Sequence, residues 1–327
     1  MKHAKLNSTT HIIEVPIPDF KIILNDSRKK SAASKNYCNA GFFANFSENG
    51  QPFTLPVAHL ICDYDATSAS TKKYCTERGK FNGDKFTFDS STWSYGNAFY
   101  KKAISTLLVN AKSNKAEIKE VVSLPTGYTY AISGIPIMRD GLDVKFDTDV
   151  VSQGWDGSPL YATWHIFIGL KKDSKNIYII GMQTTTWNMV KTAEAFRKFK
   201  EIGMFDVIKL DGGGSFHMNA SGKTVASTSE DRRINTIISF DGKVIVDDNK
   251  DDDKGRGNID KDDVKDDKVS NETNKVSDSK VENVNNQSAK PNNFASCPIK
   301  IPFLKRKNRA NDKLNKKLNL QYKDLSE

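Results

Sequence analysis

Cysteine is scarce in this sequence, and long apolar runs are missing from it. The four cysteines, Cys38, Cys62, Cys75 and Cys297, form no Cys-x-x-Cys pair, so their spacing does not match a zinc site. Two readings of them stay open: Cys62 and Cys75 close a loop in an oxidising environment, or the thiols are free and buried, which we favour. No segment approaches about 18 consecutive apolar residues, so the sequence predicts no membrane span.

Aromatic residues are absent from residues 247–293, which hold 13 acidic and 9 basic side chains. Such a polar segment buries too little apolar surface to offset the entropy lost on ordering, and we predict a disordered, charged linker. The chain then divides into a domain at 1–246, the linker at 247–293 and a basic tail at 294–327. The tail is too short to hold a core unaided; it is either a remnant binding segment or a solvated end.

Negative charge is outweighed by positive charge. The net charge is +9, to which the linker contributes −4 and the tail +6, leaving +7 on the first 246 residues. A basic domain suits an anionic substrate, such as a phosphodiester or a cell-wall polymer, although a lysine- and asparagine-rich composition is the plainer explanation. No stretch interleaves basic residues with stacking aromatic residues, so nucleic acid is not an expected partner.

The first 20 residues also lack the apolar core of a signal peptide. We therefore expect synthesis in the cytoplasm. Together with the linker and the basic tail, this favours a bacteriophage or phage-derived protein that is released by lysis or carried in the virion.

Turn residues and apolar periodicity divide the first half of the domain into short elements. Strands are expected at 11–17, 20–24 and 85–89, hairpins at 36–56 and 128–142, and a helix at 98–110, whose apolar residues recur at helical spacing. The second hairpin should turn at Asp140-Gly141, a dipeptide that favours tight turns.

The second half predicts a strand–helix–strand unit. Strands at 163–170 and 176–182 are followed by an amphipathic helix at 189–203, which ends at Gly203, and by a strand at 206–210. Strands on either side of such a helix should lie parallel, with a right-handed crossover. A last hairpin is expected at 232–247. These elements predict an α+β fold whose mixed β-sheet contains a βαβ unit.

The strand at 206–210 leads into Leu-Asp-Gly-Gly-Gly-Ser at 210–215. The βαβ prediction places Asp211 at the carboxyl end of a strand, where ligands bind in open α/β sheets. The three glycines permit positive φ angles, let a ligand approach closely and present N–H groups to an anion. The alternative is an ordinary turn between two strands, because short glycine-rich matches are weakly specific.

Four segments, taken in order, make the chain resemble the phosphodiester glycosidase family. They are Asn-Ala-Gly-Phe-Phe at 39–43, Ala-Ile-Ser-Gly-Ile-Pro with the glycine-containing turn that follows it at 131–141, His-Ile-Phe-Ile-Gly at 165–169 and Leu-Asp-Gly-Gly-Gly-Ser at 210–215. Arg232 matches the arginine that follows the glycine segment in that family. The resemblance covers about residues 36–246 and implies a hydrolase that cleaves a sugar-1-phosphate diester.

The chain departs from the family pattern at three places. His165 stands where the family usually has arginine, Ala40 replaces a glycine, and residues 179–187 lack an Asp-Gly pair. The resemblance therefore implies that phosphate recognition at position 165 is lost, or passes to His165 itself or to a lysine.

Cleavage at the anomeric carbon needs a carboxylate that stabilises or attacks an oxocarbenium-like centre or activates water. Asp211 is the candidate for this catalytic role, and its alternative is a side chain that caps the glycine loop. The candidate phosphate site consists of the backbone amides of Gly212, Gly213 and Gly214 with Ser215 and Arg232, because arginine binds phosphate oxygens in a bidentate manner.

Asn39, Gly41 and His165 complete the candidate substrate site. For Asn39 the alternative to substrate binding is a structural role in a turn, and for His165 it is a structural role as a buried core histidine. His217 stays open between a phosphate donor and a surface residue. No ligand spacing predicts a metal site, and no cofactor is expected.

The sequence thus predicts a phosphodiester glycosidase whose partner is a glycan phosphodiester, for example in an anionic cell-wall polymer or a surface polysaccharide. The alternative is a non-catalytic relative that binds carbohydrate or phosphate, as a phage structural or wall-binding protein would.

Overall fold

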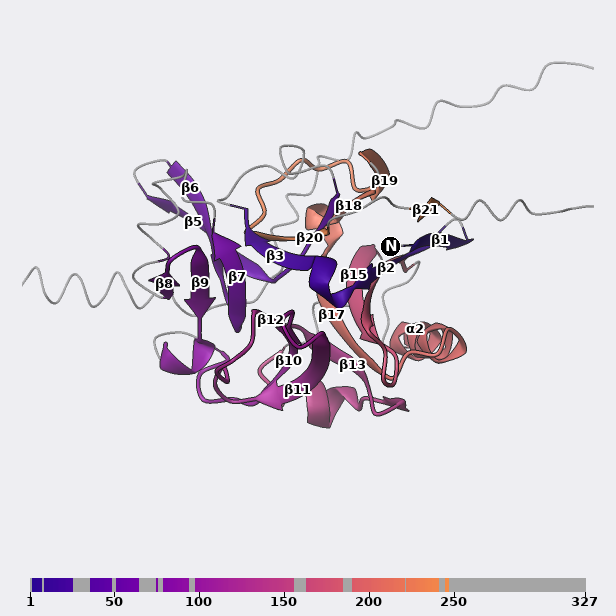
Figure 1. The fold of residues 1–327 in the computed structure, drawn as a ribbon, viewed down its shortest axis with the longest axis horizontal. Helices are drawn as coiled ribbons and strands as arrows, with labels where there is room; N and C mark the ends of the chain where they lie inside the picture. Colours follow the sequence, from indigo (N-terminus) through magenta and orange to yellow (C-terminus); the bar gives the residue numbers. More distant parts are fainter. Residues whose placement is uncertain are drawn as a thin grey trace, which may run out of the picture. The chain divides into compact units, whose positions relative to one another are not determined.

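The computed structural model describes residues 2–7, 9–25, 36–48, 51–64, 75, 79–93, 98–155, 163–184, 190–220, 222–240 and 245–246 (Figure 1). The predicted linker at 247–293 and tail at 294–327 lie outside these residues.

The described part of the chain consists mainly of β-strands, most of which belong to two large sheets (Figure 1). Helical structure comprises α2 (Val190–Glu201) and the short turns η1 (Ile17–Asp19), η3 (Ser90–Thr92), η4 (Phe146–Val150) and η5 (Gly213–Ser215). The predicted α+β class is therefore wrong, because strands far outweigh helices. Within the described ranges, no helix has the length and apolar character needed to cross a membrane.

The first sheet has eight strands in the order β14-β13-β17-β15-β16-β2-β1-β21. In chain order they are β1 (Lys2–Asn7), β2 (Thr10–Pro16), β13 (Ile135–Arg139), β14 (Leu142–Asp143), β15 (Trp164–Leu170), β16 (Asn176–Gln183), β17 (Asp206–Gly212) and β21 (Ile245–Val246). The β13–β14 hairpin turns at Asp140-Gly141, as predicted, and β15 pairs with β16 in an antiparallel hairpin.

The second sheet has eleven strands. Its path is β11-β10-β12-β7-β3-β20-β4-β18-β19, with β9 paired to β7 and β8 paired to β9. In chain order they are β3 (Phe20–Leu24), β4 (Tyr37–Asn39), β7 (Leu60–Tyr64), β8 (Lys80–Asn82), β9 (Lys85–Phe88), β10 (Ile104–Asn110), β11 (Lys115–Val121), β12 (Tyr130–Ser133), β18 (His217–Ala220), β19 (Lys223–Ser227) and β20 (Thr236–Phe240). The strands β5 (Phe43–Glu48) and β6 (Gln51–Pro56) form the separate hairpin predicted within 36–56.

The predicted βαβ unit is also wrong. Helix α2 does connect β16 to β17, and these two strands run parallel as expected, but β15 lies between them and pairs antiparallel with each. Because the short turn at 171–175 joins β15 to β16, β16 pairs with one edge of β15, and β17 pairs with the other edge. Local spacing predicted the three elements and could not show which strand fills the middle position.

Two further expectations are corrected. The predicted helix at 98–110 is wrong, because residues 104–110 form the strand β10. Residues Ile104 to Val109 are all buried, and in a strand buried on both faces the spacing of apolar residues cannot distinguish a helix from a strand. The predicted hairpin at 232–247 does not form either, because β20 pairs with β3 and β4 in one sheet whereas β21 pairs with β1 in the other.

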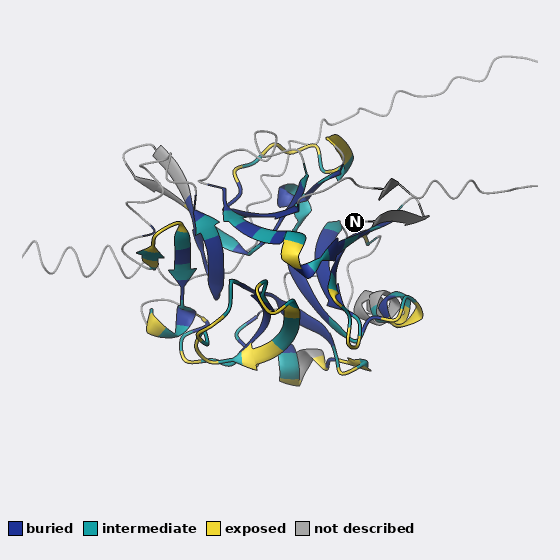
Figure 2. Cartoon of the chain, viewed as in Figure 1, coloured by how far each residue is buried: buried dark blue, intermediate teal, exposed yellow. Residues whose placement is uncertain are grey.

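A large apolar core draws side chains from both sheets, and Figure 2 shows the buried residues along their strands. Ile168 and Leu210 come from the eight-stranded sheet, and Phe20 and Ile238 from the eleven-stranded sheet. A second apolar cluster, which includes Phe167 of β15, contains Phe199 of α2. Within the described residues Cys38, Cys62 and Cys75 are free and buried, as we favoured from the sequence.

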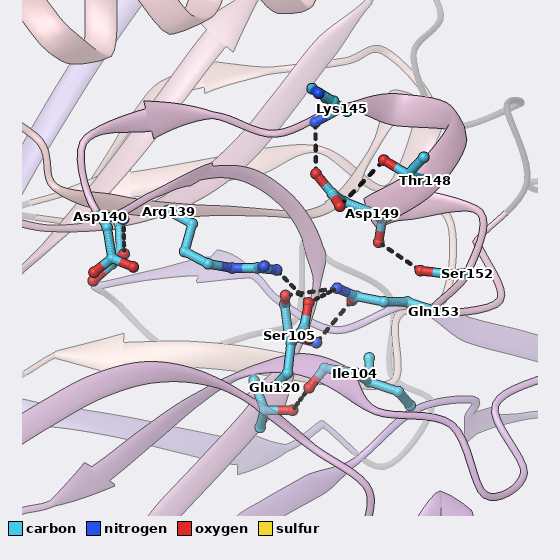
Figure 3. Close-up of polar contacts among 12 residues, drawn as sticks. Ile104, Ser105, Glu120, Arg139, Asp140, Lys145, Thr148, Asp149, Ser152 and Gln153 are labelled. Atoms are coloured by element: carbon cyan, nitrogen blue, oxygen red, sulfur yellow. Dashed lines mark hydrogen bonds and ion pairs between the residues drawn. The ribbon is translucent and has the colours of Figure 1, made fainter.

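A buried glutamine helps to join the two sheets (Figure 3). The Gln153 Oε1 accepts the backbone N–H of Ser105 at 2.8 Å, and its Nε2 donates to Glu120 Oε1 at 2.6 Å. The same carboxylate forms an ion pair with Arg139 of β13. Since Ser105 and Glu120 lie on β10 and β11, the network ties the eleven-stranded sheet to β13 of the eight-stranded sheet.

We expect Gln153→Ala to lower the free energy of unfolding by about 1–3 kcal/mol, because it removes the acceptor of a buried N–H. Urea unfolding at equilibrium would measure the change. The neighbouring Ser152→Ala is the control, since Ser152 is exposed and makes only a 3.4 Å bond to the Asp149 carbonyl. Equal stability of the two variants would show that the network contributes nothing.

Candidate active site

Residues 211–217, here called the crossing segment, carry the chain from one large sheet into the other. Strand β17 ends at Gly212 in the eight-stranded sheet, η5 makes a turn, and β18 begins at His217 in the eleven-stranded sheet. The Gly213 carbonyl accepts the Phe216 N–H at 3.0 Å and the Thr228 hydroxyl at 3.1 Å. The candidate site is therefore built at a junction between sheets.

Each of the three glycines in the crossing segment is required for a different steric reason. Gly213 has a φ of +60°, which favours glycine. A Cβ on Gly212 would lie 2.6 Å from the backbone oxygen of Trp164, and one on Gly214 would lie 2.0 Å from a Glu230 carboxylate oxygen. Of the three glycines, Gly213 uses the freedom to adopt a positive φ, and the other two make room for neighbouring groups.

Asn39, the last residue of β4, holds both ends of the crossing segment. Its Nδ2 donates to the Asp211 carbonyl at 2.9 Å, and its Oδ1 accepts the His217 N–H at 3.0 Å. Beside it, the Asp211 N–H donates to the Ala40 carbonyl at 3.0 Å. An amide side chain is required here because it offers a donor and an acceptor at once.

We expect Asn39→Ala to lower the free energy of unfolding by about 2–4 kcal/mol, because it deprives a buried carbonyl and a buried N–H of their partner. Asn110→Ala is a matched control. Asn110 also donates to one carbonyl, of Gly127 at 2.9 Å, and accepts one N–H, of Ser113 at 3.0 Å, but both bonds are exposed to water. Denaturant titration of both variants would test the prediction, and an equal loss from both would contradict it.

Asp211 is a nearly buried acid, with 8% of its surface exposed. Burial raises the pKa of its carboxyl above the ordinary value, while the hydroxyl of Ser215, the charge of Lys209, the N–H of Gly212 and the charge of Arg232 act in the opposite direction. A carboxyl that the fold retains despite the cost of burial, and surrounds with donors and cations, is typical of a functional site.

A β-bulge lies directly at Asp211. His165 of β15 pairs with Gly212, and Phe167 pairs with Lys209, so Leu210 and Asp211 of β17 together oppose one residue of β15. Bulges interrupt strand pairing and redirect side chains, and they are common beside active sites. The sequence gives no sign of this extra residue.

Arg232 reaches the crossing segment, where Glu230 engages it. Nε of Arg232 donates to Glu230 at 2.9 Å, and Nη2 donates to both carboxylate oxygens at 2.7 and 2.6 Å. A Cβ on Gly214 would lie 2.5 Å from Arg232 Nη2. The predicted arginine thus stands over the glycine turn, together with an acidic partner that the sequence analysis did not single out.

His165 lies next to the same turn, whereas Gly41 lies against Thr236 of β20 and Ile132 of β12. His165 is buried on β15 beside Gly212, with its Nε2 at 3.2 Å from the Thr184 hydroxyl. The Gly41 N–H donates to the Thr236 hydroxyl at 2.9 Å, two residues after Asn39. Of the residues that the sequence predicted for the site, Asn39, His165 and Arg232 lie against the crossing segment, which itself contains Asp211, the three glycines and Ser215, whereas Gly41 does not.

His217 is neither exposed nor at the surface. Its ring stacks on Tyr37 with centroids 5.0 Å apart, and its Nδ1 lies 2.9 Å from the Ser227 hydroxyl. The surface alternative for His217 is therefore wrong. Burial also raises the pKa of the Tyr37 hydroxyl, so the ring that stacks on His217 carries no charge near neutral pH.

The sequence analysis missed Lys209, a buried lysine two residues before Asp211. Only 2% of it is exposed; its Nζ donates to the Leu210 carbonyl at 2.9 Å and lies 4.9 Å from the centre of the Phe42 ring. A signal was present, because a lysine inside the otherwise apolar stretch 207–210 is unusual for a central strand.

An open hollow of about 780 Å³ lies at the other end of β17 and does not include Asp211. Two of its three carboxylates are already engaged: Asp206 accepts the Asp140 N–H at 2.9 Å, and Glu117 accepts the Tyr128 hydroxyl. We place the site at Asp211, where burial and converging polar groups coincide. In the part of the chain that the structure describes, no three histidine, cysteine or acidic side chains are grouped to hold a metal ion.

Comparisons with protein-family models and with curated proteins find no match to this chain. Among solved structures, it is similar to the auto-inhibited catalytic domain of zebrafish N-acetylglucosamine-1-phosphodiester alpha-N-acetylglucosaminidase, with 14% identity, a TM-score of 0.48, and coverage of 72% of this chain and 77% of that one. A hypothetical protein from Synechocystis gives 10% identity, a TM-score of 0.39 and coverages of 73% and 60%. A protein from Burkholderia pseudomallei gives 13% identity and a TM-score of 0.42, with coverage of 71% of this chain and 73% of that one. Likeness at this level concerns the fold alone and assigns no activity to the chain.

Proposed function

We propose that this chain is a hydrolase that cleaves a sugar-1-phosphate diester, with Asp211 as the carboxylate that acts at the anomeric carbon. One observation carries the proposal: segments far apart in the sequence that resemble phosphodiester glycosidases meet around Asp211. Asn39 binds the Asp211 carbonyl, His165 pairs with Gly212, and a Cβ on Gly134 would lie 2.6 Å from the Lys209 carbonyl oxygen.

The main catalytic group that this reaction requires from the protein is a carboxylate close to the anomeric carbon. When the bond between the anomeric carbon and the bridging oxygen breaks, the phosphate leaves with the bonding electrons and positive charge develops on the sugar. A phosphate is already a good leaving group. Asp211 would stabilise the cationic centre, attack it or direct water to it, and the Ser215 hydroxyl, which donates to the carboxylate, would fix its orientation.

The phosphate would bind at the glycine turn beside Arg232. The guanidinium is held there by Glu230, so a phosphodiester would exchange one anionic partner of Arg232 for another. The turn admits such a group because Gly214 presents no side chain toward Arg232.

A second function, binding without cleavage, is favoured by a specific feature of this chain. Glu230 neutralises Arg232, and His165 stands where the resembled family has arginine, so the site offers less positive charge to a phosphate than the resemblance implies. In that case the protein would bind glycan phosphodiesters, such as an anionic cell-wall polymer, and release no sugar.

A product screen in ¹⁸O-labelled water tests the proposal. The full chain would be incubated with sugar nucleotides, model glycosyl phosphodiesters and teichoic-acid-like polymers, and the products analysed by mass spectrometry. Hydrolysis at the anomeric carbon places ¹⁸O in the released sugar. Label in the phosphate would indicate cleavage of the P–O bond and contradict the proposal, whereas saturable binding with no product would support the second function.

A further inference from the structure

Lys209 places a buried positive charge next to Asp211. Both residues belong to β17, and 2% of Lys209 and 8% of Asp211 is exposed. Removing an ammonium group from water costs several kcal/mol unless nearby groups compensate. The Leu210 carbonyl, at 2.9 Å from Nζ, and the face of the Phe42 ring, at 4.9 Å, supply part of that compensation.

The groups around Asp211 come from several elements. The crossing segment contributes the Ser215 hydroxyl, β15 contributes His165 beside Gly212, and residues 230–232 contribute Arg232 together with Glu230. Glu230 offsets the charge of Arg232 because the two form a bidentate ion pair. Both cations lower the pKa of the Asp211 carboxyl, and Lys209, two residues away on the same strand, lowers it more than Arg232 does.

We propose that Lys209 is a positioning residue for the Asp211 carboxylate: its buried ammonium keeps that carboxylate ionised and so able to act at the anomeric carbon. The catalytic part rests on the proposed function, whereas the electrostatic link between the two side chains does not. Phe42 and the Leu210 carbonyl hold the ammonium in place, so its charge acts on Asp211 from a fixed position.

The first test is the pH dependence of kcat/KM in Lys209→Met. Methionine fills a similar volume without the charge, so Asp211 should bind its proton more readily. The acidic limb of the kcat/KM profile, where activity falls as Asp211 is protonated, should therefore move to higher pH. We expect kcat/KM of Lys209→Met to be roughly tenfold below the wild-type value at pH 5 and close to it at pH 8. Lys209→Arg should restore the wild-type limb, and Lys223→Met, which removes an exposed lysine from β19, should leave it unchanged. An unmoved limb in folded Lys209→Met overturns the proposal.

The second test needs no turnover. Carboxyl ¹³C NMR would follow the titration of Asp211 in the wild type and in Lys209→Met, and a displacement to higher pH in the variant is expected. If the wild type releases no sugar, the proposed function fails but this measurement still decides the role of Lys209. If Lys209→Met does not fold, Lys209→Gln takes its place.

The wild-type chain alone also provides a test. With lysine labelled at Cε, the ¹³C signal of Lys209 should change over the same pH range as the Asp211 carboxyl, because the two charges interact. A Lys209 signal that stays constant while Asp211 titrates would overturn the proposal even if no variant folds.

Discussion

Replacing Asp211 with asparagine is expected to lower the rate of sugar release from a glycosyl phosphodiester by roughly 1,000-fold or more. Asparagine has nearly the same shape and still accepts a hydrogen bond from Ser215, but it carries no negative charge to stabilise or attack the anomeric carbon. Initial rates measured by mass spectrometry would show the loss, and the substrate should still bind.

Asp173→Asn provides the matched control for this experiment. Asp173 lies in the exposed turn between β15 and β16 with a φ of +57°, which asparagine also tolerates. Its activity should stay within about twofold of the wild type, because exposed substitutions away from a site have small effects. An Asp211→Asn variant with activity within tenfold of the control would show that another group acts on the substrate.

The same substitution should not cost stability at neutral pH. Because burial raises the pKa of Asp211, the folded state binds this proton more tightly than the unfolded state does. The wild type therefore loses stability, relative to Asp211→Asn, as pH rises from the ordinary carboxyl pKa through the raised one, and the two proteins converge at low pH. Melting temperatures measured from pH 4 to 8 should show the variant equal or higher, so lost activity could not be attributed to unfolding.

Local signals in the sequence predicted elements well and their arrangement poorly. The Asp140-Gly141 hairpin and the β15–β16 pair follow from turn residues between neighbouring strands. The order of the strands depends instead on contacts between distant segments. Nothing within 232–247 shows that its two strands join different sheets.

The candidate site follows the same division. Asp211 and the glycines could be selected by residue type, and a resemblance to known motifs added Asn39. The role of Asn39 could not be predicted, because it bonds to a residue 172 positions away. Glu230 and Lys209 were missed for a physical reason: a charged residue becomes informative only once its burial and its partners are known.

Gly212→Ala is expected to destabilise the fold more than Gly213→Ala does. A Cβ at this position would lie 2.6 Å from the Trp164 carbonyl oxygen and 3.1 Å from the His165 Cα, and both are backbone atoms that move only if β15 moves. We expect a loss of about 2–3 kcal/mol in the free energy of unfolding. Activity should fall as well, because the shift would separate β15 from β17 beside Asp211.

Two further variants, Gly213→Ala and Gly222→Ala, measure the cost of backbone strain without the steric clash with β15 that Gly212→Ala creates. Both have positive φ angles, +60° and +75°, and a Cβ would meet only Thr163 Cγ2 at 3.9 Å in the first and nothing within 4 Å in the second. Each should therefore cost about 1–2 kcal/mol in urea unfolding, less than Gly212→Ala. If Gly213→Ala were the most damaging of the three, the turn would require glycine for its left-handed backbone, and contact between β15 and the crossing segment would not be what holds Asp211 in place.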